Sequence, residues 1–165
     1  LQHGQMIGRA LFKRMEALGI AVNLFANHIW YFGDMHVAKS IGLDRARRMD
    51  ACRTCLDEDV AMAIHSDAPV TPLAPLFTAW CAVNRITMSG ECLGPEQRIE
   101  ATEALEAITL GAAYTLKLDE DIGSIEAGKI ADFAVMDESP LDVEPMAIKD
   151  IKVKGVVSGG RVFLN

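Results

Sequence analysis

Hydrophobic positions in the first part of the chain change between two patterns. Along Gln5–Leu18 the apolar residues recur every three or four positions, which predicts an amphipathic helix that ends at Gly19. Ile20–Phe25 and Val60–Ile64 are short, nearly continuous apolar runs, which is typical of parallel strands covered on both faces. The chain is therefore expected to place helices between parallel strands.

The segments around these strands complete the prediction. Asn27–Asp34 is expected to form a loop, and Asp44–Leu56 is expected to form a helix with a basic face. Helical spacing returns over Leu73–Arg85 and over Thr102–Leu116, the latter as one or two helices with a break near Gly111. The order helix, strand, helix, strand implies right-handed crossovers and an α/β architecture, either layered or barrel-like.

The pattern changes near Leu118–Gly123, where glycines begin to separate short β-like runs. We therefore predict two parts, an α/β unit over residues 1–118 and a small β-rich unit over residues 119–165. The predicted strands of the second unit are Asp132–Met136, Ile151–Val157 and Arg161–Phe163.

Composition narrows the class of protein. The 165 residues carry a formal net charge of −7, which repels phosphate backbones and disfavours nucleic-acid partners. No apolar run approaches the roughly 20 residues of a membrane-spanning helix, and the default expectation is a cytoplasmic protein. The chain starts at Leu1 without a methionine or a signal-like segment, which suggests processing or a longer parent chain.

Cys52 and Cys55 form a C-x-x-C pair, which has two readings. The pair can be a redox motif or half of a zinc site. No second pair with zinc-finger spacing exists in the sequence, and the pair lies in a predicted helix. Two small residues of a helix are the favoured interpretation.

Three side chains with metal-ligand or acid–base chemistry fall at corresponding places. His28 follows the strand Ile20–Phe25, Asp67 follows the strand Val60–Ile64, and His3 precedes the first helix, where another strand would end. Parallel α/β folds bind ligands at the carboxyl ends of their strands, so these groups are candidates for one site. Each also has a structural interpretation: a hydrogen-bonded histidine, or an aspartate that caps a helix or fixes a turn. His36 and His65 lack this positional argument and are assigned structural roles.

Four segments carry a further pattern, in this order along the chain: Leu1–Gln5, Asn27–Asp34, Ile64–Leu73, and the tail from Thr102 through Gly123–Phe133. Together they resemble the amidohydrolase superfamily, specifically its YtcJ-like branch. Ile64–Leu73 looks like the segment of the eighth barrel strand that carries the aspartate. Leu1–Gln5 resembles the sixth-strand segment, whose histidine is a metal ligand, and Asn27–Asp34 resembles the seventh-strand segment. The tail from Thr102 through Gly123–Phe133 is similar to the helix and returning strand of that superfamily.

The resemblance implies the C-terminal portion of a (β/α)8 TIM-like barrel plus part of a small β-sandwich. The superfamily's first-strand His-x-His pair is absent from this sequence, and Leu1-Gln2 replaces the usual Ile-Glu. The remainder of the barrel, or a second copy of the chain, is the expected partner of such a fragment.

The activity implied by the resemblance is metal-dependent hydrolysis of a C–N bond in a small amide, N-acyl or formamide-like substrate. One or two divalent metal ions, expected to be Zn²⁺, would activate water. Asp67 would be the general base and a metal ligand, and His3 a metal ligand. His28 would contact the substrate or its oxyanion, and Trp30 and Tyr31 would line the pocket. The alternative is a non-catalytic fragment or regulatory module that keeps the fold without the metal.

Overall fold

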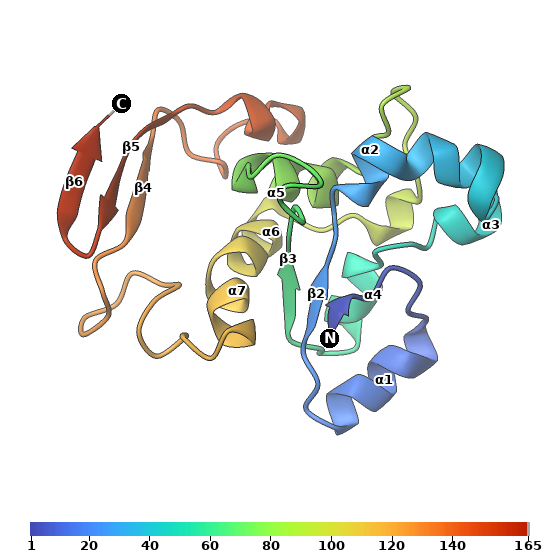
Figure 1. The fold of residues 1–165 in the computed structure, drawn as a ribbon, viewed down its shortest axis with the longest axis horizontal. Helices are drawn as coiled ribbons and strands as arrows, with labels where there is room; N and C mark the ends of the chain where they lie inside the picture. Colours follow the sequence, from blue (N-terminus) through green and yellow to red (C-terminus); the bar gives the residue numbers. More distant parts are fainter. Residues whose placement is uncertain (165) are drawn as a thin grey trace.

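Two separate three-stranded sheets organise the chain, whose residues 1–164 are described by a computed structural model (Figure 1). The first sheet contains β1 (Gln2–His3), β2 (Val22–Leu24) and β3 (Met62–Ile64), in the order β1-β2-β3. All of its pairings are parallel, with Leu24 opposite Ile64. The parallel strands expected from the two apolar runs are therefore confirmed, while no closed barrel forms within residues 1–164.

Helices connect and flank these strands. The β1–β2 connection contains α1 (Arg9–Ala17). The β2–β3 connection contains α2 (His28–Met35), the π-helical turn η1 (His36–Ser40), α3 (Leu43–Ala46) and α4 (Cys52–Asp57). After β3 come α5 (Pro75–Asn84), the 3₁₀ turn η2 (Pro95–Gln97), α6 (Ala101–Ile108) and α7 (Leu110–Thr115). None of the helices in residues 1–164 has the length and apolar character needed to cross a membrane.

The predicted loop over Asn27–Asp34 is wrong, because this segment forms most of α2. The helix begins immediately after β2, and the Tyr31 N–H donates to the Asn27 carbonyl at 3.0 Å. Its apolar residues lie on more than one side: Ile29 is buried, while Trp30 packs against aromatic side chains of α5. A helix covered on several sides lacks the one-sided apolar pattern on which the sequence argument depends.

The single helix predicted over Asp44–Leu56 is also wrong, because α3 and α4 are separated by a turn. Asp50 in this turn has a φ of 46°, which is incompatible with a right-handed helix. The buried Arg85 guanidinium donates to the carbonyls of Met49 and Asp50 at 3.0 and 3.1 Å. Both carbonyls therefore bind a side chain that is distant in the sequence.

The predicted helical segment Thr102–Leu116 forms two helices, and their junction is Thr109 rather than Gly111. Gly111 lies inside α7, where a Cβ atom would collide with the Met62 carbonyl of β3. The glycine thus permits close packing of α7 on the sheet.

The main hydrophobic core lies between the parallel sheet and its helices. Its fully buried members include Phe12 of α1, Leu24 of β2 and Trp80 of α5. Burial of each such side chain contributes about 1.5–3 kcal/mol, which holds the short strands in register.

The second sheet contains β4 (Phe133–Met136), β5 (Val153–Ser158) and β6 (Arg161–Leu164), all antiparallel, and it lies apart from the first sheet in Figure 1. This confirms the three β-like runs expected after Gly123. Between β4 and β5 the 3₁₀ segment η3 (Pro145–Asp150) returns to α5, where Trp80 Nε1 donates to the Met146 carbonyl at 3.1 Å. The division into residues 1–118 and 119–165 remains a prediction, with η3 packed on the first part.

Candidate metal and acid–base site

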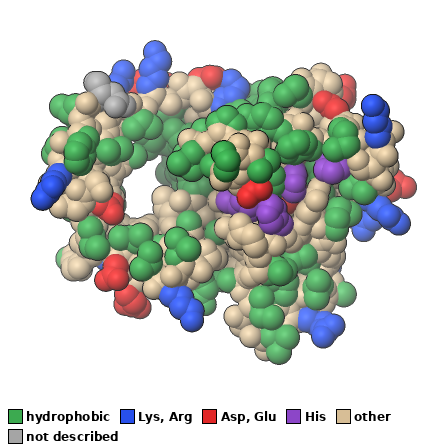
Figure 2. All heavy atoms as spheres, in the orientation of Figure 1, with side chains coloured by type: hydrophobic (Ala, Val, Ile, Leu, Met, Phe, Trp, Pro, Cys, Tyr) green, Lys and Arg blue, Asp and Glu red, His purple; other side chains and the backbone are tan. Residues whose placement is uncertain are grey.

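The three candidate side chains lie together at the carboxyl edge of the parallel sheet. His3 is the last residue of β1, His28 begins α2 just after β2, and Asp67 follows β3. The His3 Nε2 atom is 3.9 Å from the Asp67 Oδ2 atom, and the ring centroids of His3 and His28 are 6.3 Å apart. Figure 2 shows histidine side chains gathered in one region of the molecular surface. The parallel order of the strands thus brings residues from three segments to one place.

All four histidines of the chain form a row at this edge. The ring centroids are 5.0 Å apart for His65 and His3, and 6.0 Å apart for His28 and His36. Phe25 lies between them, with its ring centroid 5.2 Å from that of His65 and 4.1 Å from that of His28. The row thus includes His36 and His65, for which the sequence predicts structural roles. A signal was available for His65, because it lies two residues before Asp67, directly after the end of β3.

Buried hydrogen bonds connect the segments that carry His28 and Asp67. Asn27 is fully buried, and its Nδ2 atom donates to the Thr71 hydroxyl oxygen at 2.8 Å. The Thr71 hydroxyl in turn donates to the Ser66 carbonyl. Since these bonds lie one residue from His28 and Asp67, they fix the two functional segments relative to each other.

His3 and Asp67 share an uncommon backbone conformation, with φ values of 65° and 53°. Non-glycine residues in this left-handed region cost of order 1–3 kcal/mol and persist where the surroundings hold them. Both residues lie at strand ends, and this conformation turns the chain there. The backbone thus sets the direction of the two side chains that approach each other.

The His65 ring also supports the Asp67 backbone. Its Nδ1 atom accepts the Asp67 N–H at 3.1 Å, so a neutral ring carries its hydrogen on Nε2. Burial lowers the pKa of His65 to about 4, and the nearby His3 adds to this effect while Asp67 opposes it. His65 is therefore neutral at physiological pH and acts as an acceptor for the Asp67 loop.

The His3–Asp67 distance tests whether these side chains fit a divalent metal. At 3.9 Å the pair is too far apart for a hydrogen bond. Nitrogen and oxygen ligands lie roughly 2.0–2.2 Å from Zn²⁺, so two ligands of one tetrahedral ion are about 3.4 Å apart. An approach of about 0.5 Å would bring the pair to that separation, and an imidazole nitrogen with a carboxylate oxygen is a donor set that Zn²⁺ accepts. Among residues 1–164 there is no group of three or more His, Cys, Asp or Glu side chains arranged to hold a metal ion.

Trp30 and Tyr31, the predicted pocket residues, face α5. The Trp30 ring lies edge-on to Trp80, with the centroids 5.4 Å apart, and Tyr31 lies 6.0 Å from Phe77. Both residues are partly buried, so the structure gives them a packing role. Their contact with a substrate remains a prediction.

The C-x-x-C pair lies in α4, and both thiols are free and buried. Burial raises the pKa of Cys52 to about 12 and also raises that of Cys55. Such thiols are poor nucleophiles and poor metal ligands. This agrees with the interpretation of the pair as small helix residues.

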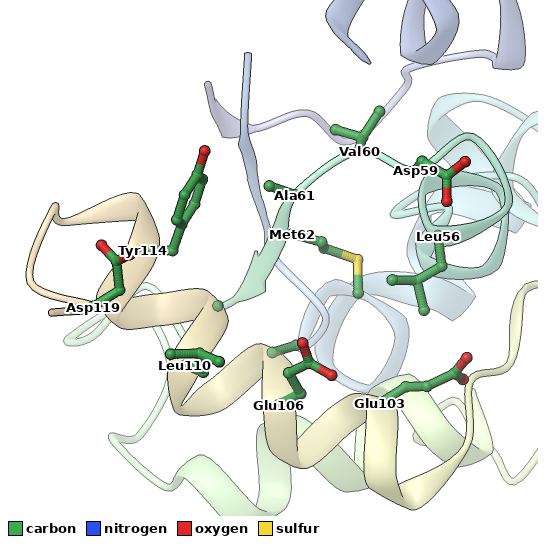
Figure 3. Close-up of a pocket in the computed structure, with 12 residues that line it drawn as sticks. Leu56, Asp59, Val60, Ala61, Met62, Glu103, Glu106, Leu110, Tyr114 and Asp119 are labelled. Atoms are coloured by element: carbon green, nitrogen blue, oxygen red, sulfur yellow. The ribbon is translucent and has the colours of Figure 1, made fainter. Parts of the chain in front are cut away.

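Two cavities lie near opposite ends of β3. One of about 300 Å³ borders the candidate site and is lined by His65, Asp67 and apolar residues such as Leu73. Another, of about 430 Å³, lies at the opposite, amino end of β3, between Val60–Met62 and helices α6 and α7 (Figure 3). The second contains carboxylates but no histidine. The cavity beside Asp67 is therefore the one associated with the candidate chemistry.

One member of the site was missed by the sequence analysis. Asp50 is fully buried in the turn between α3 and α4, and its Oδ2 atom is 3.1 Å from the His28 Nδ1 atom. The available signal was an acidic residue within the mostly apolar stretch Met49–Cys52. That signal does not identify His28 as the partner, because the turn that joins them depends on Arg85.

Comparisons with known proteins agree with this arrangement. Residues 1–163 match the family model described as the amidohydrolase family. The chain is 36% identical over 155 residues to the N-substituted formamide deformylase of Arthrobacter pascens. This match covers 93% of this chain and 28% of the deformylase. It is 27% identical to the putative amidohydrolase YtcJ of Bacillus subtilis, over 98% of this chain and 31% of YtcJ.

Solved structures show the same fold. An uncharacterized metal-dependent hydrolase from Pyrococcus horikoshii OT3 superimposes with a TM-score of 0.74 at 23% identity, over 87% of this chain and 29% of that chain. An amidohydrolase from Thermotoga maritima superimposes with a TM-score of 0.70 at 22% identity, over 99% of this chain and 36% of that chain.

The parallel strands, with histidine and aspartate at the carboxyl edge of their sheet, form an α/β fold that solved metal-dependent hydrolases share. The chain belongs to the amidohydrolase family, and the resemblance to its YtcJ-like branch is confirmed. It spans about a quarter to a third of the length of the curated relatives, with 28% of the deformylase and 31% of YtcJ covered.

Proposed function

We propose that this chain is the C-terminal part of a metal-dependent amidohydrolase that cleaves the C–N bond of a formamide-like or N-acyl substrate. The observation that carries the proposal is the approach of His3 to Asp67, at 3.9 Å, on the carboxyl edge of the sheet. The similarity to an N-substituted formamide deformylase supports the substrate class.

Each side chain has a distinct role in this proposal. His3 and Asp67 would hold a divalent metal, with Zn²⁺ the expected ion, as two members of a larger ligand set. When bound, the metal would supply Lewis acidity and would lower the pKa of water toward 7. Asp67 accepts a proton from the attacking water at a carboxylate oxygen and delivers it to the leaving nitrogen. His28 contacts the substrate, and the bond between His65 and the Asp67 N–H keeps the acid–base group in place.

The parallel sheet has an open edge on β1 within residues 1–164, whereas α7 packs against the Met62 carbonyl of β3. Unpaired strand edges bind other strands. We therefore propose that further barrel strands, or a second copy of this chain, cover the β1 edge and supply the remaining ligands. The chain alone is then expected to have no hydrolase activity.

A chimera tests the proposed activity. In this chimera, the segment of the Arthrobacter deformylase that matches this chain is replaced by this chain. The part of the deformylase that precedes the matching segment is kept. The chimera, loaded with Zn²⁺, is expected to hydrolyse N-alkyl formamides. Asp67→Asn should lower kcat by about 10²–10⁴-fold, the usual contribution of a general acid–base group.

The matched control is Asp142→Asn, because Asp142 is exposed and distant from the site in sequence. It should leave kcat within about twofold of the unmodified chimera. An Asp67→Asn chimera with full activity would contradict the role given to Asp67. A folded, zinc-loaded chimera without any activity would favour the alternative, a segment that keeps the fold without catalysis.

A further inference from the structure

Asp50 is the most unusual polar residue near the candidate site. Its side chain is fully buried, and its Oδ1 atom has no hydrogen-bond partner among the described residues. Burial of a carboxylate with an unbonded oxygen costs free energy that a buried apolar residue would not. A role in holding the turn alone therefore does not account for an acid at this position.

The main chain at Asp50 is tightly held. The Asp50 N–H donates to the Gln5 carbonyl at 2.8 Å, and its carbonyl accepts the Cys52 N–H at 2.8 Å and Arg85 Nη1 at 3.1 Å. These bonds fix the residue at its φ of 46°. Since the bonds come from three segments, the position of the carboxylate is set independently of the His28 ring.

Burial and the neighbouring groups act on the pKa of Asp50 in opposite directions. Arg85 is also fully buried and brings a positive charge to the Asp50 backbone. Burial raises the pKa of Asp50, whereas the bond to His28, the charge of Arg85 and the Phe25 N–H oppose that rise. A buried cation beside the turn thus offsets much of the cost of a buried anion there.

We propose that Asp50 is a positioning residue that accepts a hydrogen bond from the His28 Nδ1–H and thereby leaves the His28 Nε2 lone pair to bind substrate. The inference rests on the proposed function for the identity of that substrate. The carboxylate fixes both the tautomer and the orientation of the ring, because an ionised carboxylate only accepts hydrogen bonds.

The tautomer decides which substrate atom His28 binds. A neutral ring with hydrogen on Nδ1 offers a lone pair at Nε2, so it accepts a hydrogen bond from a donor. An amide N–H or the attacking water is such a donor, whereas a carbonyl oxygen is not. His28 therefore accepts a hydrogen bond from the N–H of a secondary amide or from the attacking water, and it does not bind the oxyanion.

The test is the tautomer of His28 in the ¹⁵N-labelled chain, measured by long-range ¹H–¹⁵N correlation NMR at a pH above the usual histidine range. The His28 ring is assigned by the signals lost in His28→Gln. The expected result is a protonated Nδ1 with a downfield proton and an unprotonated Nε2. A ring with its hydrogen on Nε2 would overturn the proposal, and this measurement requires no variant at Asp50.

Two variants extend the test. Asp50→Asn should move the Nδ1 proton upfield or release the fixed tautomer, because a charged acceptor is replaced by a neutral amide. Asp34→Asn is the matched control. Asp34 lies on α2, the helix that also carries His28, but its carboxylate accepts hydrogen bonds from Ser89. An Asp50→Asn spectrum identical to that of the unmodified chain would overturn the proposal.

The readout separates this proposal from the proposed function. The tautomer is measured without metal, substrate or turnover. A fixed Nδ1–H tautomer in a chain whose chimera has no hydrolase activity would therefore uphold the role of Asp50 and contradict only the proposed reaction.

Discussion

Arg85 is the side chain whose replacement should cost the most stability near the site. It is 1% exposed and donates to four carbonyl oxygens, of Leu93, Asp50, Met49 and Arg47, at 2.8, 3.1, 3.0 and 3.4 Å. Arg85→Met keeps an apolar stem but removes all four of these hydrogen bonds, and the Asp50 carbonyl then keeps its bond from the Cys52 N–H. Hydrogen bonds to charged groups contribute about 1.5–3 kcal/mol each, and bonds from one side chain are not additive. The expected loss is about 3–5 kcal/mol in the free energy of unfolding.

Urea unfolding followed by tryptophan fluorescence measures this loss, because Trp80 is fully buried in the folded chain. The melting temperature should fall by about 6–20 °C for a chain of this length. Arg47→Met is the control, since Arg47 is half-exposed and forms a surface ion pair with Glu96 at 3.2 Å. Such pairs contribute about 0–1 kcal/mol. A loss below about 1 kcal/mol for Arg85→Met would refute the idea that Arg85 holds the Asp50 turn.

Three further predictions follow from particular residues. A thiol reagent should modify the exposed Cys92 rapidly and the buried Cys52, Cys55 and Cys81 only after unfolding; rapid modification of Cys52 would revive the redox interpretation. The Ser89 hydroxyl donates to Asp34 and lowers the pKa of that carboxyl. The bond therefore stabilises the fold above the ordinary carboxyl pKa, and this contribution is lost as the pH falls through the lowered pKa of the folded chain. Ser89→Ala should raise the pKa of Asp34 in a ¹³C NMR titration, and an unchanged value would contradict this. Sedimentation velocity should show concentration-dependent association through the open edge of β1, and a strict monomer at all concentrations would argue against it.

Local patterns in the sequence predicted the strands and the place of the site. The apolar runs around Val22–Leu24 and Met62–Ile64 identified two parallel strands, and the rule for strand carboxyl ends selected His3, His28 and Asp67. These inferences depend only on residues close in sequence and on a general property of parallel sheets.

Long-range contacts account for what the sequence did not predict. The turn at Asp50 exists because Arg85, 35 residues away, binds its carbonyl, and no glycine or proline marks it. The helix α2 is covered by α5 on a side that its own sequence does not reveal. The His28–Asp50 bond depends on both features, so it was visible only in the structure.

The most direct test of the metal-site hypothesis is calorimetric titration of the chain with Zn²⁺, together with His3→Ala, Asp67→Asn and the control Asp142→Asn. The chain should bind Zn²⁺ more weakly than a complete four-ligand site, because His3 and Asp67 supply only part of a ligand set. Loss of either side chain should weaken binding by at least about tenfold, since a two-donor site becomes a one-donor site, while Asp142→Asn should match the unmodified chain. Zinc affinity that is unchanged in both His3→Ala and Asp67→Asn would contradict the proposal that these two residues hold the metal.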